Sequence, residues 1–316
     1  MKRLAVGAAL ALTACGEGSF SSAPPATAAD GAAAALAPSD LPAFFDGLRV
    51  SGHAVVSAHR GGPRPGYAEN TIEAFAATLA EAPVFIEVDV RRTRDGALVL
   101  MHDETVDRTT TGSGAVRDLA LAEVQALALV DADGGRAEGA VPTLRQALDW
   151  AHGRTVLELD IKPGVAYEDV VREVEAADAM RRVIFIGASI GGAGRLARLA
   201  PDAMISTSIE SASDLVTLER RGADLSHILA WLGDDELSPS LVRALAERDM
   251  ESRFGVFGRD LRFAEAVANG ISSVSVDAPE AAVQMLDEAD GMDGYAALTC
   301  LGAWRGADGS LWINEG

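Results

Sequence analysis

Short apolar runs alternate with longer amphipathic stretches along most of the chain. Val, Ile, Leu and Phe dominate the short runs, as is typical of strands buried in a parallel sheet. We expect eight strands, at Ala54–Ala58, Val84–Val90, Thr155–Ile161, Val183–Gly187, Ala203–Ser208, His227–Trp231, Ser252–Phe257 and Ile271–Val276. Parallel strands need long crossovers, so this order favours an α/β protein with a (β/α)8 TIM-type barrel. A doubly wound open sheet is the alternative.

The stretches between most of these strands carry apolar residues at helical spacing. They predict helices at Thr71–Glu81, Thr143–Ala151, Tyr167–Ala179, Ala212–Arg221, Pro239–Arg248 and Leu261–Asn269. Asn70 with Glu73 predicts a capping box at the start of the first helix.

The second strand continues into a hairpin instead of a helix. Asp95 and Gly96 stand between apolar runs, and this pair is a strong signal for a two-residue turn. With these two residues at the centre of the turn, Asp89 lies opposite His102. We therefore expect a β-hairpin extension that brings His102 beside Asp89.

The first residues have the pattern of an export signal. Lys2 and Arg3 precede an apolar run, Leu4–Leu12, that is too short to span a bilayer as a helix. The run ends in Leu12-Thr13-Ala14-Cys15, which resembles the lipobox of bacterial lipoproteins. We expect residues 1–14 to be a lipoprotein signal peptide and residues 15–50 to be a lipidated Cys15 with a flexible tether. An ordinary cleaved signal with a chance cysteine is the alternative.

Composition restricts the partners of the chain. With 48% hydrophobic residues among 316, it can bury a large core. The net charge of −20 argues against nucleic acid and anionic membrane surfaces, because both repel an acidic protein. We expect an exported monomer that faces the periplasm or the exterior and is attached to a bacterial membrane only through Cys15.

Two carboxylates project from one face of the second strand. Glu87 and Asp89 are two residues apart and share that face, whereas Val88 and Val90 lie on the other. Adjacent carboxylates repel each other unless a positive charge lies between them, and Mg²⁺ and Ca²⁺ prefer oxygen ligands. A solvated strand edge is the alternative, but neighbouring residues such as Phe85 indicate a buried strand. We expect one divalent cation here, Mg²⁺ or Ca²⁺.

The strand at Thr155–Ile161 repeats the pattern. Glu158, Asp160 and Lys162 share one face of it. We expect Asp160 to be the third cation ligand because it is nearer the carboxyl end of the strand, with Glu158 as the alternative. Lys162 is the one lysine that remains once the signal is removed, and its ammonium can bind a phosphate oxygen as a point charge. The alternative for Lys162 is an internal salt bridge with a carboxylate.

Two histidines flank this acidic group. His59 ends the first strand and His102 follows the hairpin. An imidazole titrates near neutral pH, so one ring can activate a nucleophile while the other protonates the leaving oxygen. Arg60 can add a phosphate contact. The other histidines, His53, His152 and His227, are separate from this group, and we interpret them as structural.

At this point the chain resembles the glycerophosphodiester phosphodiesterase family, in a bacterial lipoprotein form. The matching motifs are His59-Arg60-Gly61, Glu69-Asn70-Thr71, Glu87-x-Asp89, Asp95-Gly96, His102-Asp103, Arg108-Thr109-Thr110, Asp160-Ile161-Lys162-Pro163 and Val276-Asp277-Ala278-Pro279.

The resemblance implies a phosphodiesterase barrel over residues 51–289 and a metal-dependent hydrolysis of glycerophosphodiesters to sn-glycerol 3-phosphate and an alcohol. It also implies a role for each candidate residue: His59 and His102 as catalytic acid and base, Glu87, Asp89 and Asp160 as metal ligands, and Arg60 and Lys162 as phosphate-binding residues.

The chain departs from the family pattern in places that concern the substrate. A Trp-Thr-x-Asn strand is not recognisable around Ser252–Phe257, and Glu104–Val141 is where the family places a small insertion that shapes the substrate site. Two alternative functions therefore stay open, a lysophospholipase D-like phosphodiesterase acting on lysophospholipids and a non-catalytic phosphodiester-binding lipoprotein. The tail at residues 290–316, with Trp304 and Trp312, lies outside the resemblance.

Overall fold

The computed structural model describes residues 36–258 and 262–290. The expected signal peptide, Cys15 and the tail from residue 291 onward lie outside the described residues. Among the residues that are described, no helix combines the length and the apolar composition that crossing a bilayer requires.

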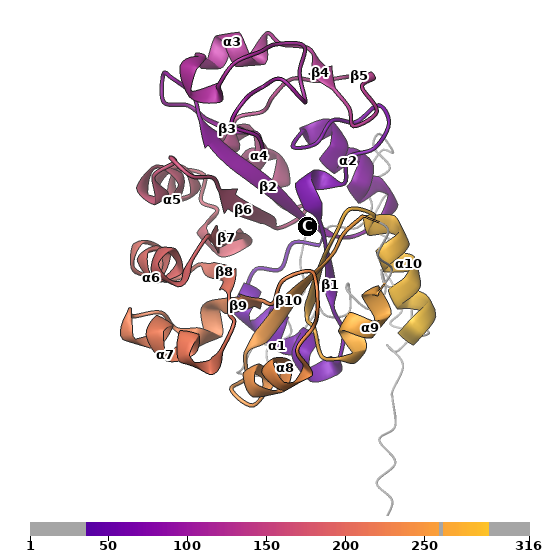
Figure 1. The fold of residues 1–316 in the computed structure, drawn as a ribbon, viewed down its shortest axis with the longest axis vertical. Coiled ribbons are helices and arrows are strands. Elements are labelled where there is room, and N and C mark those ends of the chain that lie inside the picture. Colours follow the sequence, from indigo (N-terminus) through magenta and orange to yellow (C-terminus); the bar gives the residue numbers. More distant parts are fainter. Residues whose placement is uncertain (1–35, 259–261, 291–316) are drawn as a thin grey trace, which may run out of the picture. The chain divides into compact units, whose positions relative to one another are not determined.

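Eight parallel strands close into a barrel surrounded by helices (Figure 1). In order around the barrel they are β1 (Val55–Ala58), β11 (Ser273–Val276), β10 (Glu251–Val256), β9 (Ile228–Trp231), β8 (Met204–Ser208), β7 (Val183–Gly187), β6 (Leu157–Ile161) and β2 (Phe85–Arg92). The β1–β2 pairing closes the ring. This confirms the predicted (β/α)8 TIM-type barrel and excludes the open sheet. Each predicted strand is present, with ends that differ by no more than two residues.

Helices follow the barrel strands on the outside of the ring. They are α2 (Ile72–Glu81), α4 (Leu144–Ala151), α5 (Tyr167–Ala176), α6 (Ile190–Leu199), α7 (Ala212–Arg220), α8 (Pro239–Ala246), α9 (Phe263–Ala268) and α10 (Pro279–Asp290). Short 3₁₀ turns are η1 (His59–Gly61), η2 (Val116–Asp118), η3 (Met180–Arg182) and η4 (Leu225–His227). The sequence predicted neither α6 nor α10.

A further helix, α1 (Leu41–Ser51), corrects the predicted tether. Asp40 caps it by accepting from the backbone N–H of Ala43 at 3.0 Å, and Gly52 ends it with a left-handed φ of 74°. Its buried residues, with Leu36, pack against the first residues of several barrel strands; this cluster comprises Leu36, Leu41, Phe44, Phe45, Leu48, Val55, Phe85, Val156, Ile184, Met204 and Leu229. From residue 36 onward, the segment expected to be a flexible tether is therefore part of the barrel's core.

The contact between α1 and the barrel contains a buried carboxyl group. Glu251, 2% exposed, accepts from the Nε of Arg49 at 2.9 Å. Burial outweighs this pairing and raises the pKa of the Glu251 carboxyl to about 7, against 4.5 ordinarily. Between these pH values the folded state binds more protons than the unfolded chain, so the free energy of unfolding falls as pH rises.

We expect Glu251→Gln to remove this fall in the free energy of unfolding with rising pH, because the glutamine side chain cannot ionise. Relative to wild type, the variant should gain stability from about pH 5 to about pH 8, by about 1–3 kcal/mol. Thermal melts of both proteins across this range measure the difference. A difference that stays constant with pH would contradict the argument.

The hairpin after β2 is present, but its predicted register is wrong by one residue. In the antiparallel pair of β2 with β3 (Leu98–Leu100), Val90 is opposite Leu100, and the N–H of Met101 donates to the carbonyl of Asp89 at 2.9 Å. The loop has three residues instead of two, because the Oγ1 of Thr93 accepts from the N–H of Ala97 at 2.9 Å. Gly96 ends this loop with a left-handed φ of 91°. Asp89 is therefore opposite Met101, and His102 lies one residue further on.

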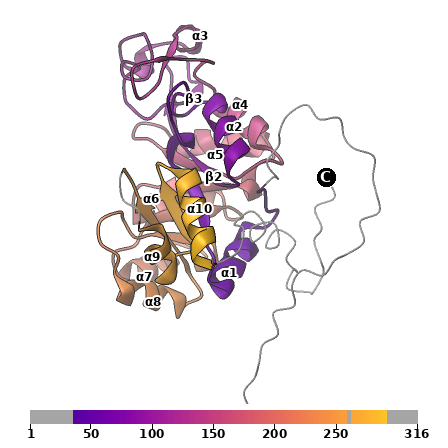
Figure 2. The same cartoon turned by 90° about the vertical axis from the view of Figure 1, so that its right-hand side faces the viewer.

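The segment after the hairpin forms a small insertion with its own apolar cluster. It contains η2, α3 (Leu121–Gln125), β4 (Leu129–Val130) and β5 (Arg136–Ala137). Its cluster includes Val106, Val116, Val124, Leu129 and Val141 together with Val99 and Met101 of the hairpin region. In both views the insertion lies at the opposite end from α1 (Figures 1 and 2).

Candidate active site

Neighbouring strands bring three predicted ligands together. The parallel pairing of β2 with β6 sets Glu87 beside Glu158 and Asp89 beside Asp160. Oxygen atoms of Glu87, Asp89 and Asp160 lie within 4.8 Å of one another. Glu87 is 5% exposed and Asp89 is 1% exposed. Asp160 is half-buried, so the structure forms a largely buried acidic cluster from the residues that the sequence indicated.

The electrostatics of this cluster suit a divalent cation. Burial, followed by repulsion from Asp89, raises the pKa of the Glu87 carboxyl well above its usual range. The backbone N–H of Arg60 opposes this by donating to the Oε2 of Glu87 at 2.8 Å. Three convergent carboxylates are the oxygen donors that Mg²⁺ and Ca²⁺ prefer. The residues present therefore fit such an ion.

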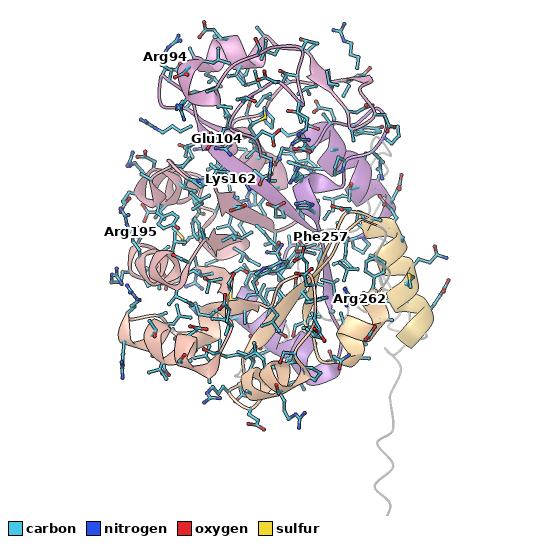
Figure 3. All side chains as sticks on the ribbon, viewed as in Figure 1. Arg94, Glu104, Lys162, Arg195, Phe257 and Arg262 are labelled. Atoms are coloured by element: carbon cyan, nitrogen blue, oxygen red, sulfur yellow. The ribbon has the colours of Figure 1, made fainter. Side chains whose placement is uncertain are left out.

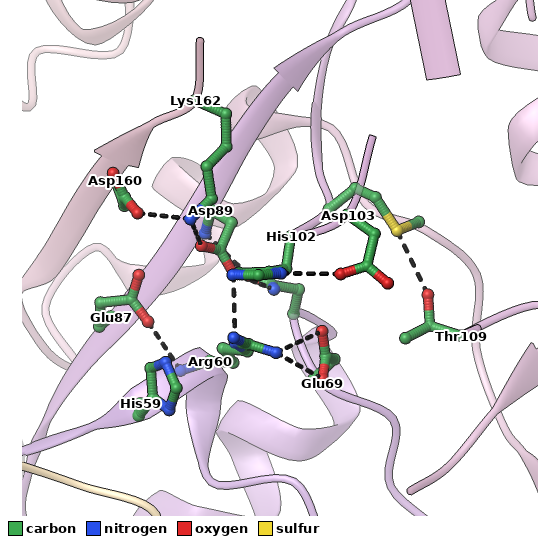
Figure 4. Close-up of polar contacts among 12 residues, drawn as sticks. His59, Arg60, Glu69, Glu87, Asp89, His102, Asp103, Thr109, Asp160 and Lys162 are labelled. Carbon is green, nitrogen blue, oxygen red and sulfur yellow. Dashed lines mark hydrogen bonds and ion pairs between the residues drawn. The ribbon is translucent and has the colours of Figure 1, made fainter. Parts of the chain in front are cut away.

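Lys162 supplies positive charge to the same cluster (Figure 4). Its Nζ lies 2.6 Å from the Oδ1 of Asp89 and 2.5 Å from the Oδ2 of Asp160. This is the internal ion pair that was the alternative to a phosphate contact. The ammonium offsets part of the repulsion between the two carboxylates.

Glu158 belongs to a separate buried network. Its Oε2 accepts from Ser57 at 2.6 Å and pairs with Arg253 at 2.5 Å, and the residue is fully buried. Its partners therefore lie outside the acidic cluster, and Asp160 is the third member of that cluster.

Asn70 positions Asp89, a role for Asn70 that the sequence did not indicate. Its Nδ2 donates to the Oδ2 of Asp89 at 2.6 Å, and the backbone N–H of Asp89 donates to the Oδ1 of Asn70 at 2.9 Å. The predicted capping box is wrong, since Thr71 caps α2 by accepting from the N–H of Ala74. Asn70 has a left-handed φ of 59°, which asparagine tolerates better than most residues.

Each candidate catalytic histidine is held by a carboxylate. The Nδ1 of His59 lies 2.7 Å from the Oδ1 of Asp277, and that of His102 lies 2.8 Å from the Oδ1 of Asp103. Asp103 is in turn bound by Arg108, which lowers the pKa of the Asp103 carboxyl, while the hydrogen bond with His59 lowers the pKa of Asp277. With Nδ1 engaged, the Nε2 of each ring is left for a ligand.

The two aspartates are site residues that sequence reasoning did not select. Asp103 directly follows His102, and Asp277 directly follows β11, which is the barrel neighbour of β1 before His59. Their position inside the quoted motifs was the available signal. Phe257 also contacts His59, with ring centroids 4.9 Å apart, and Figure 3 labels it near the carboxyl end of β10.

Arg60 offers an unused donor beside the acidic cluster. Its Nη1 donates to Glu69 at 3.2 Å, and Arg108 binds the same carboxylate at 2.7 Å. Its Nε is buried, 3.8 Å from the Oδ2 of Asp89, and within the described part of the chain it has no hydrogen-bond partner. A buried donor without a partner is costly, so this atom suits a ligand oxygen.

Comparison with known proteins gives consistent matches. The sequence model of the Glycerophosphoryl diester phosphodiesterase family matches residues 59–274. A glycerophosphodiester phosphodiesterase of Caldanaerobacter subterraneus is 36% identical over 137 residues, which cover 41% of this chain and 56% of that protein. The chain spans about half the length of the curated relatives it matches.

Solved structures share the fold. The crystal structure of a glycerophosphoryl diester phosphodiesterase from Parabacteroides distasonis has a TM-score of 0.69 at 27% identity, covering 74% of this chain and 86% of that one. A phosphodiesterase of Oleispira antarctica, solved in complex with the product sn-glycerol-3-phosphate, has a TM-score of 0.61 at 19% identity, covering 76% and 99%.

Proposed function

This chain belongs to the glycerophosphoryl diester phosphodiesterase family, and from that premise we propose that it hydrolyses a glycerophosphodiester to sn-glycerol 3-phosphate and an alcohol. One observation carries the proposal. The barrel holds a cluster of three carboxylates, two of them buried, together with two histidines whose Nδ1 atoms are each bound by an aspartate.

The acidic cluster is the proposed site of one divalent cation, Mg²⁺ or Ca²⁺. Glu87, Asp89 and Asp160 would hold it, and when bound it would supply positive charge that neutralises the phosphoryl oxygens. Asn70 keeps Asp89 in place, since its Nδ2 donates to the carboxylate and its Oδ1 accepts from the backbone N–H of Asp89.

Arg60 and Lys162 are the proposed phosphate-binding residues. The buried Nε of Arg60 has a free hydrogen to donate beside the cluster. The Nζ of Lys162 neutralises Asp89 and Asp160, and it becomes available to a phosphate oxygen once those carboxylates are otherwise compensated. Together the two side chains would orient the phosphodiester between the histidines.

His59 and His102 are the proposed acid and base. One Nε2 takes the proton of the attacking hydroxyl, from water or from the glycerol 2-hydroxyl, while the other gives a proton to the departing alcohol oxygen. If the 2-hydroxyl attacks first, water then opens the cyclic phosphate with the proton roles reversed. Asp277 and Asp103 hold the rings in orientation and stabilise whichever imidazolium forms.

The test is a choline-release assay on two substrates, with and without a chelator. We expect the full chain to release choline from sn-glycero-3-phosphocholine in the presence of Mg²⁺ or Ca²⁺, and the chelator to stop the reaction. Release from lysophosphatidylcholine but not from glycerophosphocholine would favour a lysophospholipase D-like enzyme instead. Tight binding of the diester without any product would favour a binding protein.

The cellular setting is a separate proposal that depends on the sequence alone. We propose export under the signal at residues 1–14, a lipid anchor on Cys15 and a monomer facing the periplasm or the exterior. The anchor and the signal lie outside the described residues. Mass spectrometry of the mature N-terminus tests it, and an unmodified Cys15 would contradict the anchor.

A further inference from the structure

Basic residues form the next layer of the barrel above the acidic cluster. Arg91 stands two residues beyond Asp89 on β2, and Lys162 stands two residues beyond Asp160. The N–H of Lys162 donates to the carbonyl of Val90 at 3.1 Å, so the pairing of the two segments continues to this level. Two residues of strand advance about 6.6 Å. The backbone of this layer therefore lies one step beyond the cluster, and the Nζ of Lys162 reaches back to Asp89 and Asp160.

A cavity of about 100 Å³ lies beside this layer, between the insertion and the loop after β6. It is lined by Arg91, Arg92 and Arg117, by Glu104 and Val116, and by residues 163–165 that follow Lys162. Figure 3 labels Glu104 and Lys162 at this side of the barrel. Three arginines and one glutamate line the cavity, and Asp169 lies beside Arg92, so the lining is basic although the chain as a whole has a net charge of −20.

The arginines that line this cavity have guanidinium N–H groups that donate no hydrogen bond to the described residues. Arg91 uses its Nε and Nη2 on the carbonyl of His102, at 2.9 and 2.6 Å, and makes no hydrogen bond through Nη1 to the described residues. Arg92 is 49% exposed, and its Nε is 3.7 Å from Asp169, too far for a hydrogen bond. Arg117 is exposed and has no hydrogen bond or ion pair through its guanidinium with the part of the chain described.

Arg91 also connects the cavity to the catalytic residues. Its guanidinium is attracted electrostatically by four carboxylates, those of Glu104, Asp89, Asp103 and Asp160. It contacts the backbone of His102 directly. A group bound by Arg91 from the cavity side would therefore lie close to His102.

We propose that this cavity binds an anionic group, a carboxylate or a phosphate, on the alcohol half of the substrate. The inference rests on the proposed function, because in a glycerophosphodiester the glycerol half is neutral and any second anion comes from the alcohol. Guanidinium forks bind both kinds of anion through charge-assisted hydrogen bonds. The subsite selects acidic alcohols over neutral or cationic ones.

Two matched substrate pairs test the subsite with the full chain and its cation. sn-Glycero-3-phosphoserine differs from sn-glycero-3-phosphoethanolamine by one carboxylate, and sn-glycero-3-phosphoglycerol can be compared with its terminal phosphate ester. We expect kcat/KM to be about tenfold higher for the anionic member of at least one pair, as one charge-assisted contact allows. The pair that shows the preference identifies which anion binds.

Variants of exposed residues separate the subsite from general electrostatics. Arg117→Gln should reduce the preference several-fold and leave kcat/KM for the ethanolamine ester unchanged, whereas Glu104→Gln should increase the preference. Arg136→Gln is the matched control, since it removes the same charge from an exposed arginine of the same insertion outside the cavity lining. It should leave the preference as it is in wild type.

Failure of the subsite and failure of the proposed function are distinguishable. Turnover of both pairs without an anion preference, or an equal effect of Arg117→Gln and Arg136→Gln, would overturn the subsite alone. No turnover of any diester would overturn the function. Calorimetric binding of the serine and ethanolamine esters then tests the subsite by itself, and equal affinities would overturn it.

Discussion

Replacing His102 with alanine is expected to lower kcat/KM for sn-glycero-3-phosphocholine by about 10²–10⁴-fold, and replacing His59 should do the same. The Nδ1 of each ring is held by an aspartate, which fixes the ring and leaves its Nε2 for the proposed proton transfer. In the proposed mechanism, removing either ring takes away one of the two proton transfers. Steady-state kinetics with a saturating cation measure the loss.

Controls separate this loss from misfolding. His152→Gln removes an exposed histidine at the end of α4, before the amino end of β6, and should leave kcat/KM unchanged. Added imidazole should restore part of the activity of His102→Ala, since it can occupy the vacated volume and move the same proton. Full activity in either alanine variant would remove the histidine pair from the mechanism.

The second large effect is expected at the acidic cluster. Asp89→Asn should weaken the binding of Mg²⁺ or Ca²⁺ by more than about 100-fold and abolish turnover at ordinary cation concentrations. Asp89 is 1% exposed and is the member of the cluster bound by both Asn70 and Lys162. An amide in its place has nearly the same shape but lacks the charge that the cation requires.

Calorimetric titration of the chelator-treated proteins measures this affinity. Asp118→Asn, which neutralises an exposed carboxylate in the insertion, is the matched control and should bind the cation as wild type does. Equal cation affinity in Asp89→Asn and wild type would place the ion elsewhere.

The barrel strands could be predicted from the sequence because they are short apolar runs in a protein with a large core. Helix α6 could not, because its sequence contains Gly191, Gly192 and Gly194, and glycine lowers helix propensity by about 1 kcal/mol each. Its buried Ala193 and Leu196 pack against the core instead, so tertiary contacts decide the conformation.

Helix α1 was missed for a different reason. Small residues and prolines before it suggested a tether, although Leu41, Phe44, Phe45 and Leu48 already stand at helical spacing. The pattern was present, and the composition of the preceding segment obscured it.

Parts of the site depend on geometry that residue spacing does not determine. The hairpin has a three-residue loop because the side chain of Thr93 closes it, and the Asp-Gly pair alone did not indicate this. Likewise, Asn70 binds Asp89 instead of capping a helix. The acidic cluster itself was predictable, because alternate residues of a strand share one face and the parallel pairing of β2 with β6 sets Asp89 beside Asp160.

In the proposed mechanism, the carboxylate cluster and the histidine pair together hydrolyse a glycerophosphodiester. The most direct measurement is the ³¹P NMR spectrum of sn-glycero-3-phosphocholine incubated with the full chain. With Mg²⁺ or Ca²⁺ present, the diester signal should be replaced by that of sn-glycerol 3-phosphate, and a chelator should prevent the change. A diester signal that persists with the cation present, or one that is lost equally in the chelator, would contradict the account.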